Sequence, residues 1–551
     1  YTIRLVHISS VSPGPGENDA AREALRILTE GGLEGAYTAS GLDPIIGDSH
    51  GRVNAYAFVR GASSRTVVLL GHIDTVATED YGALEPYALD PDALAARLDT
   101  LASMTPGLQA DLDAHPGDWL FGRGGADMKS GVASNLALMR HFATLAQKGE
   151  LPLSVVLLAT PDEEHEGAGV LQGVHFLLRL REQHNLDYLG AINTDYVSAL
   201  YPGDPHRYIY TGTIGKLLPS FLIVGKESHV GDPFDGLDAN LIAAELIGDL
   251  SMADDLCDSV RGQVTAPPVT LHATDLKFHY DVQLPFMSYF YLNILTFTST
   301  PADILARLHA RAEAALMRVL QRVDASERRW IAAQGDATRP DQVKPRTGTV
   351  VDYATLHAEV VNRLGESAVT SALDAEWDAC PPEADSRERC LRLVRRLWVL
   401  SGRPGPAVVV YFSPPYCPHV SSPPSPLLEA VSAVVAAHPD LNLAIGEYFP
   451  LLSDMSYLRQ DPSVDTAALV ANMPVWRDPA PDAPPTRSGA YTLPFDAIRA
   501  LDLPVIDLGV YGKGAHQRGE RVLMSYSFGD VPQLIYETIM RLAEITSPGS
   551  P

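Results

Sequence analysis

The first part of the chain alternates between segments with strand-like and helix-like spacing of apolar residues. Thr66 to Leu70 and Leu153 to Ala159 are short runs of apolar and β-branched residues, which predict buried strands. Ala20 to Thr29 has apolar positions at helical spacing. Up to about Tyr210, this alternation predicts a sheet with helices on its faces, which is an α/β fold.

The pattern changes near Thr211, where glycines begin to separate new strands and a second domain is expected to start. Leu237 to Leu250 predicts an apolar-rich helix. Residues from about Ile304 to Leu400 have the composition of charged amphipathic helices, interrupted by the polar stretch from Gln334 to Thr347. This part of the second domain is therefore predicted to be a partly exposed helical insertion.

A return to the first domain is predicted after the strand-like segment Ala407 to Phe412, through the proline-rich run from Pro414 to Pro426. Leu427 to Ala437 predicts a helix. Pro504 to Gly509 predicts a buried strand that leads into the glycine-rich segment Gly512 to Gly519. Two domains also agree with the length of 551 residues, because single hydrophobic cores stop growing near roughly 250 to 300 residues.

Composition and charge narrow the class of protein. Apolar residues make up 46% of the chain, yet no stretch approaches the roughly 18 uninterrupted apolar residues of a membrane span. The net charge of −26 would repel phosphate backbones and anionic lipids, so neither nucleic acid nor a membrane is an expected partner. The first residues show no secretion signal and the scattered cysteines form no CxxC pair, which favours a cytoplasmic protein.

Polar residues that can carry chemistry follow the predicted strands. Val67 to Val76 places His72 and Asp74 two residues apart, just beyond an apolar strand. A histidine ligand commonly needs a carboxylate or carbonyl at its second ring nitrogen, and a nearby Asp can supply it. By itself, this segment is equally consistent with a surface loop that contains two polar residues.

Phe121 to Gly131 is a glycine-dense turn that presents Asp127 shortly before a helix. Glycines let the backbone pass close to a ligand. A phosphate-binding loop is the rival interpretation, but the spacing matches neither GxGxxG nor GxxxxGK, and Asp127 would repel an anion. A carboxylate that bridges metal ions is therefore the better interpretation of Asp127.

Leu157 to Gly169 runs from a predicted strand into a series of polar residues. Adjacent carboxylates at Glu163 and Glu164 repel each other unless a cation shares the site. A metal on one and a proton on the other resolves this conflict, so that one is a ligand and the other a general base for water. A solvated acidic turn is the commoner explanation of such a run in isolation.

Asp195 and His516 complete the set of candidate ligands. Asp195 follows a short apolar stretch, and His516 lies in the glycine-rich segment after the last predicted strand. Each is weak evidence alone, because single His and Asp residues are usually structural. A chance arrangement would rarely place candidate His, Asp and Glu ligands after one predicted strand after another. Together, these residues therefore predict one metal site. The predicted ligands are His72, Asp127, Glu164, Asp195 and His516.

In this order, the motifs resemble the M20 family of metallopeptidases and amidohydrolases, and most closely its long arginine-utilisation branch. The resemblance covers nearly the whole chain, from the opening segment Leu5 to Glu17 as far as His516. It implies two divalent metal ions, zinc in the first place with cobalt or manganese as alternatives. Two triads that share one carboxylate would hold them, namely His72, Asp127 and Asp195, and Asp127, Glu164 and His516.

The resemblance also implies three catalytic roles outside the ligand set. Asp74 would orient His72, and Glu163 would be the general base that takes a proton from water and passes it to the leaving amine. His229 resembles a lid histidine that helps to stabilise the oxyanion, and a surface histidine beside a turn is the alternative. In many relatives this histidine acts across a dimer, so a homodimer is one of the states to expect.

The family fold implied is a zinc-peptidase-like α/β catalytic domain that is interrupted by an α/β lid domain. We expect the catalytic domain in residues 1–212 and 422–551, and the lid in residues 213–421 with an extra helical insertion at about 304–400. This lid is longer than is usual in the family. Tyr280 to Ile294 contains no Arg, so the sequence does not indicate the grip on a substrate carboxylate that is typical of carboxypeptidases.

The expected function is metal-dependent hydrolysis of an amide bond in a small peptide or an N-acyl amino acid. A peptidase, an aminoacylase and an amidohydrolase that acts on a guanidino compound are alternatives within this class. The hypothesis from another class is a non-catalytic binding or regulatory protein of arginine metabolism that retains the fold. The complete ligand set together with Glu163 favours the hydrolase.

Overall fold

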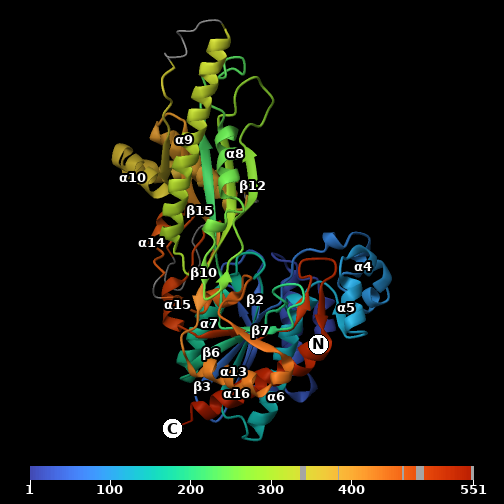
Figure 1. Cartoon of the computed structure of the whole chain (residues 1–551). Helices are drawn as coiled ribbons and strands as arrows, with labels where there is room; N and C mark the ends of the chain where they lie inside the picture. Colours follow the sequence, from blue (N-terminus) through green and yellow to red (C-terminus); the bar gives the residue numbers. More distant parts are fainter. Residues whose placement is uncertain (335–342, 382–383, 462–463, 479–488, 548–551) are drawn as a thin grey trace. The chain divides into compact units, whose positions relative to one another are not determined.

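The chain folds into two compact units (Figure 1). The computed structural model describes residues 1–334, 343–381, 384–461, 464–478 and 489–547. The first unit comprises residues 1–214, 418–461 and 493–551, and the second comprises residues 215–417 and 462–492. None of the helices among the described residues combines the length and apolar character needed to cross a membrane.

A mixed sheet forms the centre of the first unit, and the described residues give it eight strands in the order β1-β2-β5-β3-β6-β18-β7-β17. The pairs β5–β3, β3–β6, β6–β18 and β7–β17 are parallel, whereas β1–β2, β2–β5 and β18–β7 are antiparallel. In sheet order, the strands are Ala39–Pro44, Val53–Val59, Ser154–Thr160, Arg65–His72, Asp187–Asn193, Val505–Asp507, Arg207–Tyr210 and Leu443–Gly446. The carboxyl ends of β5, β3, β6 and β18 therefore lie along one edge.

Helices cover both faces of this sheet, which explains why its central strands are continuous apolar runs. On one face, α6 packs against β2, β3 and β5. The helices α2 and α16 lie beside α6, and α13 lies beside α16. On the other face, α7 packs together with α15 (Figure 1). Alternate residues of β3 face opposite ways, so Val67 and Leu69 join the core under α6 whereas Val68 and Leu70 do not. The helices are α1 Thr2–Val6, α2 Gly16–Thr29, α6 Ser130–Gln147, α7 Ala168–His184, α13 Pro426–Ala437, α15 Phe495–Leu501 and α16 Val531–Ile545.

Two smaller structures extend the first unit. Between β3 and β4 (Trp119–Phe121), the chain forms the short helices α3 (Pro91–Ala95), α4 (Leu98–Met104) and α5 (Leu108–Ala114). The strand β4 pairs with β20 (Arg521–Leu523), which pairs in turn with β19 (Gly512–Lys513). The glycine-rich segment is therefore a hairpin on a sheet of its own. A further short pair joins β8 (Gly212–Thr213) to β16 (Val420–Ser421).

The second unit has its own sheet, in which the described residues form five strands in the order β12-β13-β9-β15-β14. These strands are Val269–Asp275, Met287–Thr296, Gly215–Val224, Ala407–Cys417 and Thr349–Asp352, and β10 (Ser259–Val260) pairs with β11 (Gln263–Val264) beside them. Its helices are α8 Ala239–Leu250, α9 Pro301–Ala333, α10 Tyr353–Leu364, α11 Glu366–Asp378, α12 Ser386–Ser401 and α14 Ala467–Ala471. The expected α/β fold class with an extra helical insertion is confirmed.

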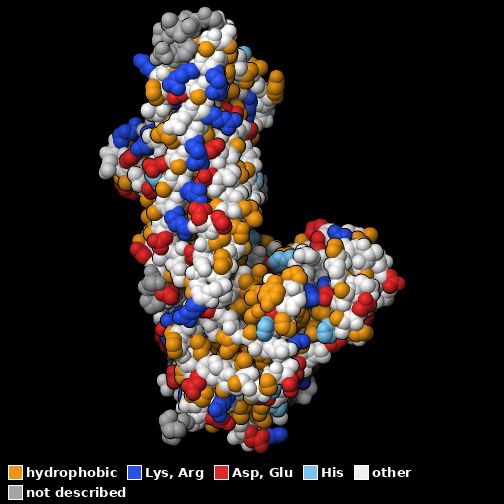
Figure 2. All heavy atoms as spheres, viewed as in Figure 1, with side chains coloured by type: hydrophobic (Ala, Val, Ile, Leu, Met, Phe, Trp, Pro, Cys, Tyr) orange, Lys and Arg blue, Asp and Glu red, His pale blue; other side chains and the backbone are white. Residues whose placement is uncertain are grey.

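The helix α9 shows why this insertion is stable in water. It begins with a capping box in which Thr300 and Asp303 satisfy each other's backbone N–H groups. Acidic and basic side chains are interspersed over its surface (Figure 2), and Arg318 Nε lies 2.6 Å from Glu245 Oε1 on α8. Within the predicted interruption from Gln334 to Thr347, residues 335–342 lie outside the described part of the chain.

The structure differs from the expected domain assignment in one segment. Residues 462–492, which we expected in the catalytic domain, group with the second unit. Asn472 shows the reason, because its side-chain oxygen accepts a hydrogen bond from Ala354 N and its backbone oxygen accepts one from Phe412 N, each 2.9 Å long. The predicted linker is also shorter than expected, since Pro414 to Cys417 continue strand β15.

Close backbone packing at Gly509 gives a test of this fold. A Cβ added there would lie 1.4 Å from the carbonyl oxygen of Asp195, directly after β6. Gly509→Ala should therefore destabilise the protein by about 3 kcal/mol or more, because a backbone atom cannot move aside without disturbing the sheet. Gly248→Ala in α8, where the added Cβ has nothing within 4 Å, should be neutral or stabilise by up to about 1 kcal/mol.

Thermal unfolding followed by circular dichroism measures both variants against the wild type. An unchanged unfolding temperature for Gly509→Ala would contradict the close approach of β18 and β6.

Candidate metal centre

The carboxyl ends of three neighbouring strands bring most of the predicted ligands together. His72 is the last residue of β3, Glu163 and Glu164 follow β5, and Asp195 follows β6. Because β3 lies between β5 and β6 with parallel pairing on both sides, these strand ends meet at one edge of the sheet. Ligand sites in sheets of this kind lie beyond the carboxyl ends of the strands.

The two remaining ligands come from loops outside the large sheet. Asp127 lies just before α6, and His516 lies in the loop between β19 and β20. Asp127 Oδ1 is 3.0 Å from His72 Nε2, and Asp127 Oδ2 is 3.2 Å from His516 Nε2. The carboxylate of Asp127 thus lies between the two predicted histidine ligands.

Two groups of three side chains among the described residues are arranged so that each could hold a metal ion. Within each group, the ligand atoms lie within 4.8 Å of one another, and Asp127 belongs to both groups. One group is His72, Asp127 and Asp195, and the other is Asp127, Glu164 and His516. The structure therefore brings all five predicted ligands together, and their imidazole nitrogens and carboxylate oxygens fit zinc, cobalt or manganese.

Asp74 contacts both a histidine and the two glutamates. Its Oδ1 lies 3.4 Å from His72 Nδ1, and its backbone oxygen lies 3.2 Å from the same nitrogen. The same carboxylate accepts hydrogen bonds from the backbone N–H groups of Glu163 (3.2 Å) and Glu164 (3.0 Å). One fully buried carboxylate thus fixes the imidazole ring and the turn that presents the glutamates, which is the geometry that an orienting role requires.

The adjacent glutamates approach different histidines. Glu164 Oε1 lies 2.9 Å from His516 Nε2, whereas Glu163 Oε2 lies 4.0 Å from His72 Nε2. Burial, and then the charge of Glu164, raise the pKa of Glu163 well above its usual value. Burial and the charge of Asp127 likewise raise the pKa of Glu164. Burial is the main cause of both shifts, and the predicted repulsion between the adjacent carboxylates contributes to that of Glu163.

Both histidines are strongly basic in the absence of a metal. Burial lowers the pKa of His72, but hydrogen bonds to Asp127 and Asp74 outweigh this and raise the pKa well above its ordinary value. Hydrogen bonds to Asp127 and Glu164 raise the pKa of His516 to about 11. A protonated His516 therefore compensates the carboxylates at neutral pH, and a metal ion would have to displace this proton.

Two buried carboxylates that the sequence analysis did not identify support the predicted ligands. Glu520 Oε1 accepts a hydrogen bond from Asp127 N (3.2 Å), and Asp507 Oδ1 accepts one from Asp195 N (3.0 Å). Burial raises the pKa of Glu520 to about 7. The sequence could have indicated these two residues only by their places at strand ends. Asp507 ends β18, and Glu520 immediately precedes β20.

His229 belongs to the second unit, and its predicted role at the oxyanion stays a prediction. Its side chain is exposed, and its Nδ1 accepts a hydrogen bond from Gly231 N (3.0 Å). Its backbone forms a bridge with Gln283. Within its own unit, His229 is thus an exposed residue at a turn.

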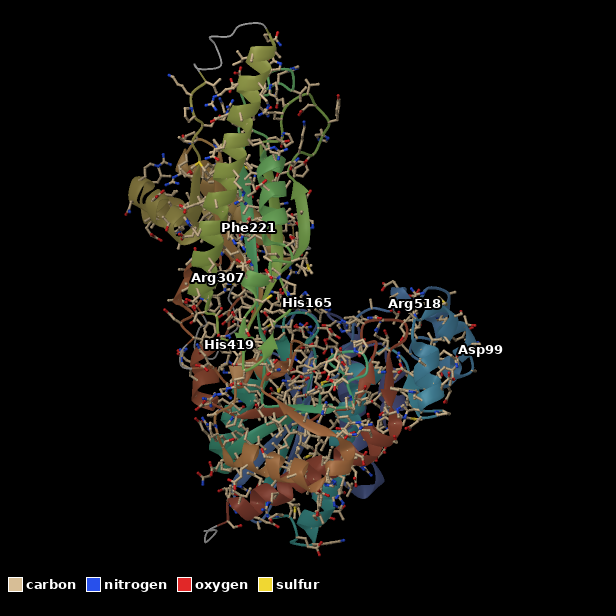
Figure 3. All side chains as sticks on the ribbon, in the orientation of Figure 1. Asp99, His165, Phe221, Arg307, His419 and Arg518 are labelled. Atoms are coloured by element: carbon tan, nitrogen blue, oxygen red, sulfur yellow. The ribbon has the colours of Figure 1, made fainter. Side chains whose placement is uncertain are left out.

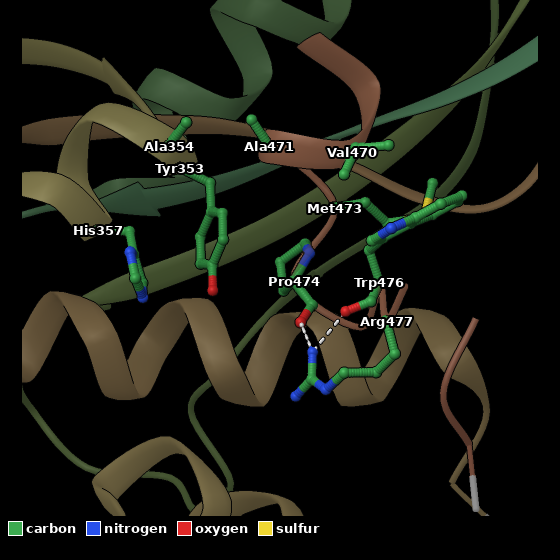
Figure 4. A pocket seen from close by; sticks show the side chains of 9 residues that line it. All are labelled: Tyr353, Ala354, His357, Val470, Ala471, Met473, Pro474, Trp476 and Arg477. Carbon is green, nitrogen blue, oxygen red and sulfur yellow. Dashed lines mark hydrogen bonds between the residues drawn. The ribbon is translucent and has the colours of Figure 1, made fainter. Parts of the chain in front are cut away.

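The second unit also contains a cavity of about 360 Å³ (Figure 4). Arg477, one of the residues that line it, donates hydrogen bonds to the backbone oxygens of Pro474 (3.3 Å) and Trp476 (2.6 Å). The described residues that line the cavity include no Asp or Glu, so this cavity does not offer the acidic ligand set of the metal centre. They are Tyr353, Ala354, His357, Val470, Ala471, Met473, Pro474, Trp476 and Arg477.

Comparisons with known proteins agree with this geometry. Residues 68–470 match the model of a family described as peptidase family M20/M25/M40. The chain is 31% identical over 564 residues to Protein RocB of Bacillus subtilis (strain 168), covering 98% of this chain and 94% of RocB.

Two solved structures are similar over almost their whole length. Aminopeptidase PepT from Bacillus cereus ATCC 10987 has a TM-score of 0.51 at 13% identity, covering 98% of this chain and 97% of that chain. The M20 family metallo-carboxypeptidase Sso-CP2 from Sulfolobus solfataricus has a TM-score of 0.50 at 11% identity, covering 99% and 98%. At such low identities, the two structures show a shared fold.

The basicity of His516 predicts that metal binding releases protons. Because its pKa is raised from 6.5 to about 11, His516 of the metal-free protein keeps its proton up to about pH 11. An imidazole that binds a metal ion must be neutral. The apparent affinity for Co²⁺ should therefore rise as the pH rises from about 6 to 9. The proton on His516 also stabilises the metal-free protein. This stabilisation is fully present below the pKa that His516 has in the unfolded chain, and it is lost as the pH rises through about 11.

Titration calorimetry at one pH, in buffers of different ionisation enthalpy, measures the protons released. Identical heats in all buffers would contradict a protonated metal-free site, and His516→Ala should release fewer protons than the wild type.

Proposed function

Because the chain belongs to peptidase family M20/M25/M40, we propose that it is a metal-dependent hydrolase that cleaves an amide bond of a small peptide or an N-acyl amino acid. The family match and the nearly full-length similarity to RocB confirm the resemblance expected from the sequence. The observation that carries the proposal is the pair of potential metal-binding triads that share Asp127. Zinc is the first candidate for both ions, and cobalt and manganese are alternatives.

Each residue of the centre has a distinct part in this proposal. Divalent cations held by the two triads would polarise the substrate carbonyl and lower the pKa of a water molecule. Glu163 is the general base, because it adjoins the ligands without belonging to either triad and because burial raises its pKa, which makes its carboxylate a stronger proton acceptor. Glu163 takes a proton from the water as the water oxygen bonds to the carbonyl carbon, and it passes this proton to the nitrogen of the leaving amine as the C–N bond breaks.

The position of the base depends on Asp74. The Asp74 carboxylate holds the backbone N–H of Glu163 at 3.2 Å and that of Glu164 at 3.0 Å, so the base and the neighbouring ligand share one support. Glu163 Oε2 lies 4.0 Å from His72 Nε2, which keeps the base next to a ligand of the first triad. A protein that retained only the fold would not need this arrangement, which favours the hydrolase over a non-catalytic relative.

The exchange Glu163→Gln tests the proposal. It should lower kcat by about 10³-fold, because the amide keeps the size of the carboxylate but cannot take up a proton. Metal content should stay at about two ions per chain, because Glu163 is not a ligand in either triad. Glu166→Gln, the same change three residues further along the loop, is the matched control and should keep kcat within about twofold.

Elemental analysis measures the metal content, and a panel of dipeptides, N-acetyl amino acids and amide-linked guanidino compounds measures hydrolysis. The active members of the panel identify the substrate class. Wild-type turnover by Glu163→Gln would refute the base. A wild-type protein that stays inert after zinc, cobalt or manganese is added would favour a binding or regulatory protein.

A further inference from the structure

The hairpin that carries His516 has two cations facing each other at its base. The strands β19 and β20 place Lys513 directly opposite Arg521. Like charges directly opposite each other on antiparallel strands destabilise the pairing. A single carboxylate offsets this repulsion, because Asp111 Oδ1 lies 2.5 Å from Lys513 Nζ and Asp111 Oδ2 accepts a hydrogen bond from Arg521 Nη2.

The contact between Asp111 and Arg521 is largely shielded from water, whereas the side chain of Lys513 is 35% exposed. The side chain of Asp111 is 15% exposed and that of Arg521 is 6% exposed. Trp119 Nε1 donates a hydrogen bond to the backbone oxygen of Asp111 (3.0 Å), and the Arg521 guanidinium lies 5.4 Å from the centre of the Trp119 ring. Burial raises the pKa of Asp111, but hydrogen bonds from Lys513 and Arg521 outweigh it and hold this pKa below its ordinary value.

The same helical segment also packs against the far end of the loop. A Cβ added at Gly519 would lie 2.4 Å from Thr105 Cγ2, between α4 and α5. Arg521 Nη1 donates a hydrogen bond to the Gly519 oxygen (2.7 Å). Figure 3 labels one residue on each side of this contact, Asp99 on α4 and Arg518 in the loop. Side-chain charge and close packing therefore act on the same hairpin.

The loop needs such support because its backbone is strained at the ligand itself. His516 has a φ of 60°, in the left-handed region that non-glycine residues rarely adopt. A residue in this conformation persists where its surroundings over-determine it. On the metal side, His516 Nε2 contacts Asp127 and Glu164, and on the other side the hairpin is held through Lys513 and Arg521.

We propose that Asp111 is a positioning residue for His516, and that the helical segment Pro91–Ala114 clamps the loop that supplies this ligand. The inference rests on the proposed function, since it requires His516 to bind a metal ion. Neutralising Asp111 leaves two cations opposed at the base of the hairpin, so His516 loses its alignment with Asp127 and Glu164. The triad of His72, Asp127 and Asp195 takes no ligand from the hairpin, which contacts it only through the shared Asp127.

Co²⁺ titration of Asp111→Asn tests the proposal, with absorption spectra and calorimetry to resolve the two sites. One site should weaken by about tenfold or more, as losses of residues that support a ligand typically do, and the other should stay within about twofold. The weakened site should be the one that His516→Ala loses. Adding Lys513→Gln to Asp111→Asn removes the repulsion and should restore part of the lost affinity.

The control variant is Asp43→Asn. Like Asp111, Asp43 is a carboxylate of the first unit that has two side-chain partners, so its variant controls for the loss of such a charge. Asp43 accepts hydrogen bonds from Gln172 (3.0 Å) and Arg179 (2.8 Å), and its variant should bind Co²⁺ at both sites like the wild type. Thermal unfolding of all variants separates a local effect from a general loss of structure.

Three outcomes would overturn the inference. Wild-type affinity at both sites of Asp111→Asn would show that the hairpin does not need the carboxylate. Equal weakening of both sites with a lower unfolding temperature would show a general structural role. A wild-type protein that binds no Co²⁺ would overturn the proposed function as well, whereas two intact wild-type sites leave that proposal standing.

Discussion

The position of the Asp127 carboxylate between two imidazoles is the constraint on which the rest of the centre depends. Its two oxygens lie 3.0 Å and 3.2 Å from the Nε2 atoms of His72 and His516. Burial raises the pKa of Asp127, but hydrogen bonds to His516 and His72 outweigh it and lower the pKa well below its usual range. A buried anion is costly unless cations or donors surround it, so both histidines and the backbone around Asp127 have to be held in place.

The two histidines are held by different means. His72 ends a central strand of the large sheet and has Asp74 at its second ring nitrogen, so the main core of the first unit fixes it. His516 lies on a small separate sheet, and its side chain is 47% exposed. One predicted ligand, His72, is thus part of the core, whereas the other, His516, depends on contacts to its hairpin.

The helical segment between β3 and β4 explains how an exposed loop can carry a ligand. Its carboxylate at Asp111 pairs with both cations at the base of the hairpin, while Glu520 joins the other end of the loop to the backbone of Asp127. Charge compensation therefore connects a peripheral segment to the centre of the first unit. The helices of the second unit belong to a different core, in which α9 is supported by its own cap and ion pairs.

The sequence by itself determined the alternating elements, the α/β class and the five residues that the structure brings together, because strand and helix periods and strand-end motifs are local patterns. Only the tertiary structure decided that residues 462–492 join the second unit, that Pro414 to Cys417 extend a strand, that Glu520 contacts the backbone of Asp127 and that Asp111 contacts the hairpin of His516. Asp111 and Lys513 are 402 positions apart. Local spacing carries no information about such a pair, because its partners meet only when the small sheet and the helical segment have packed together.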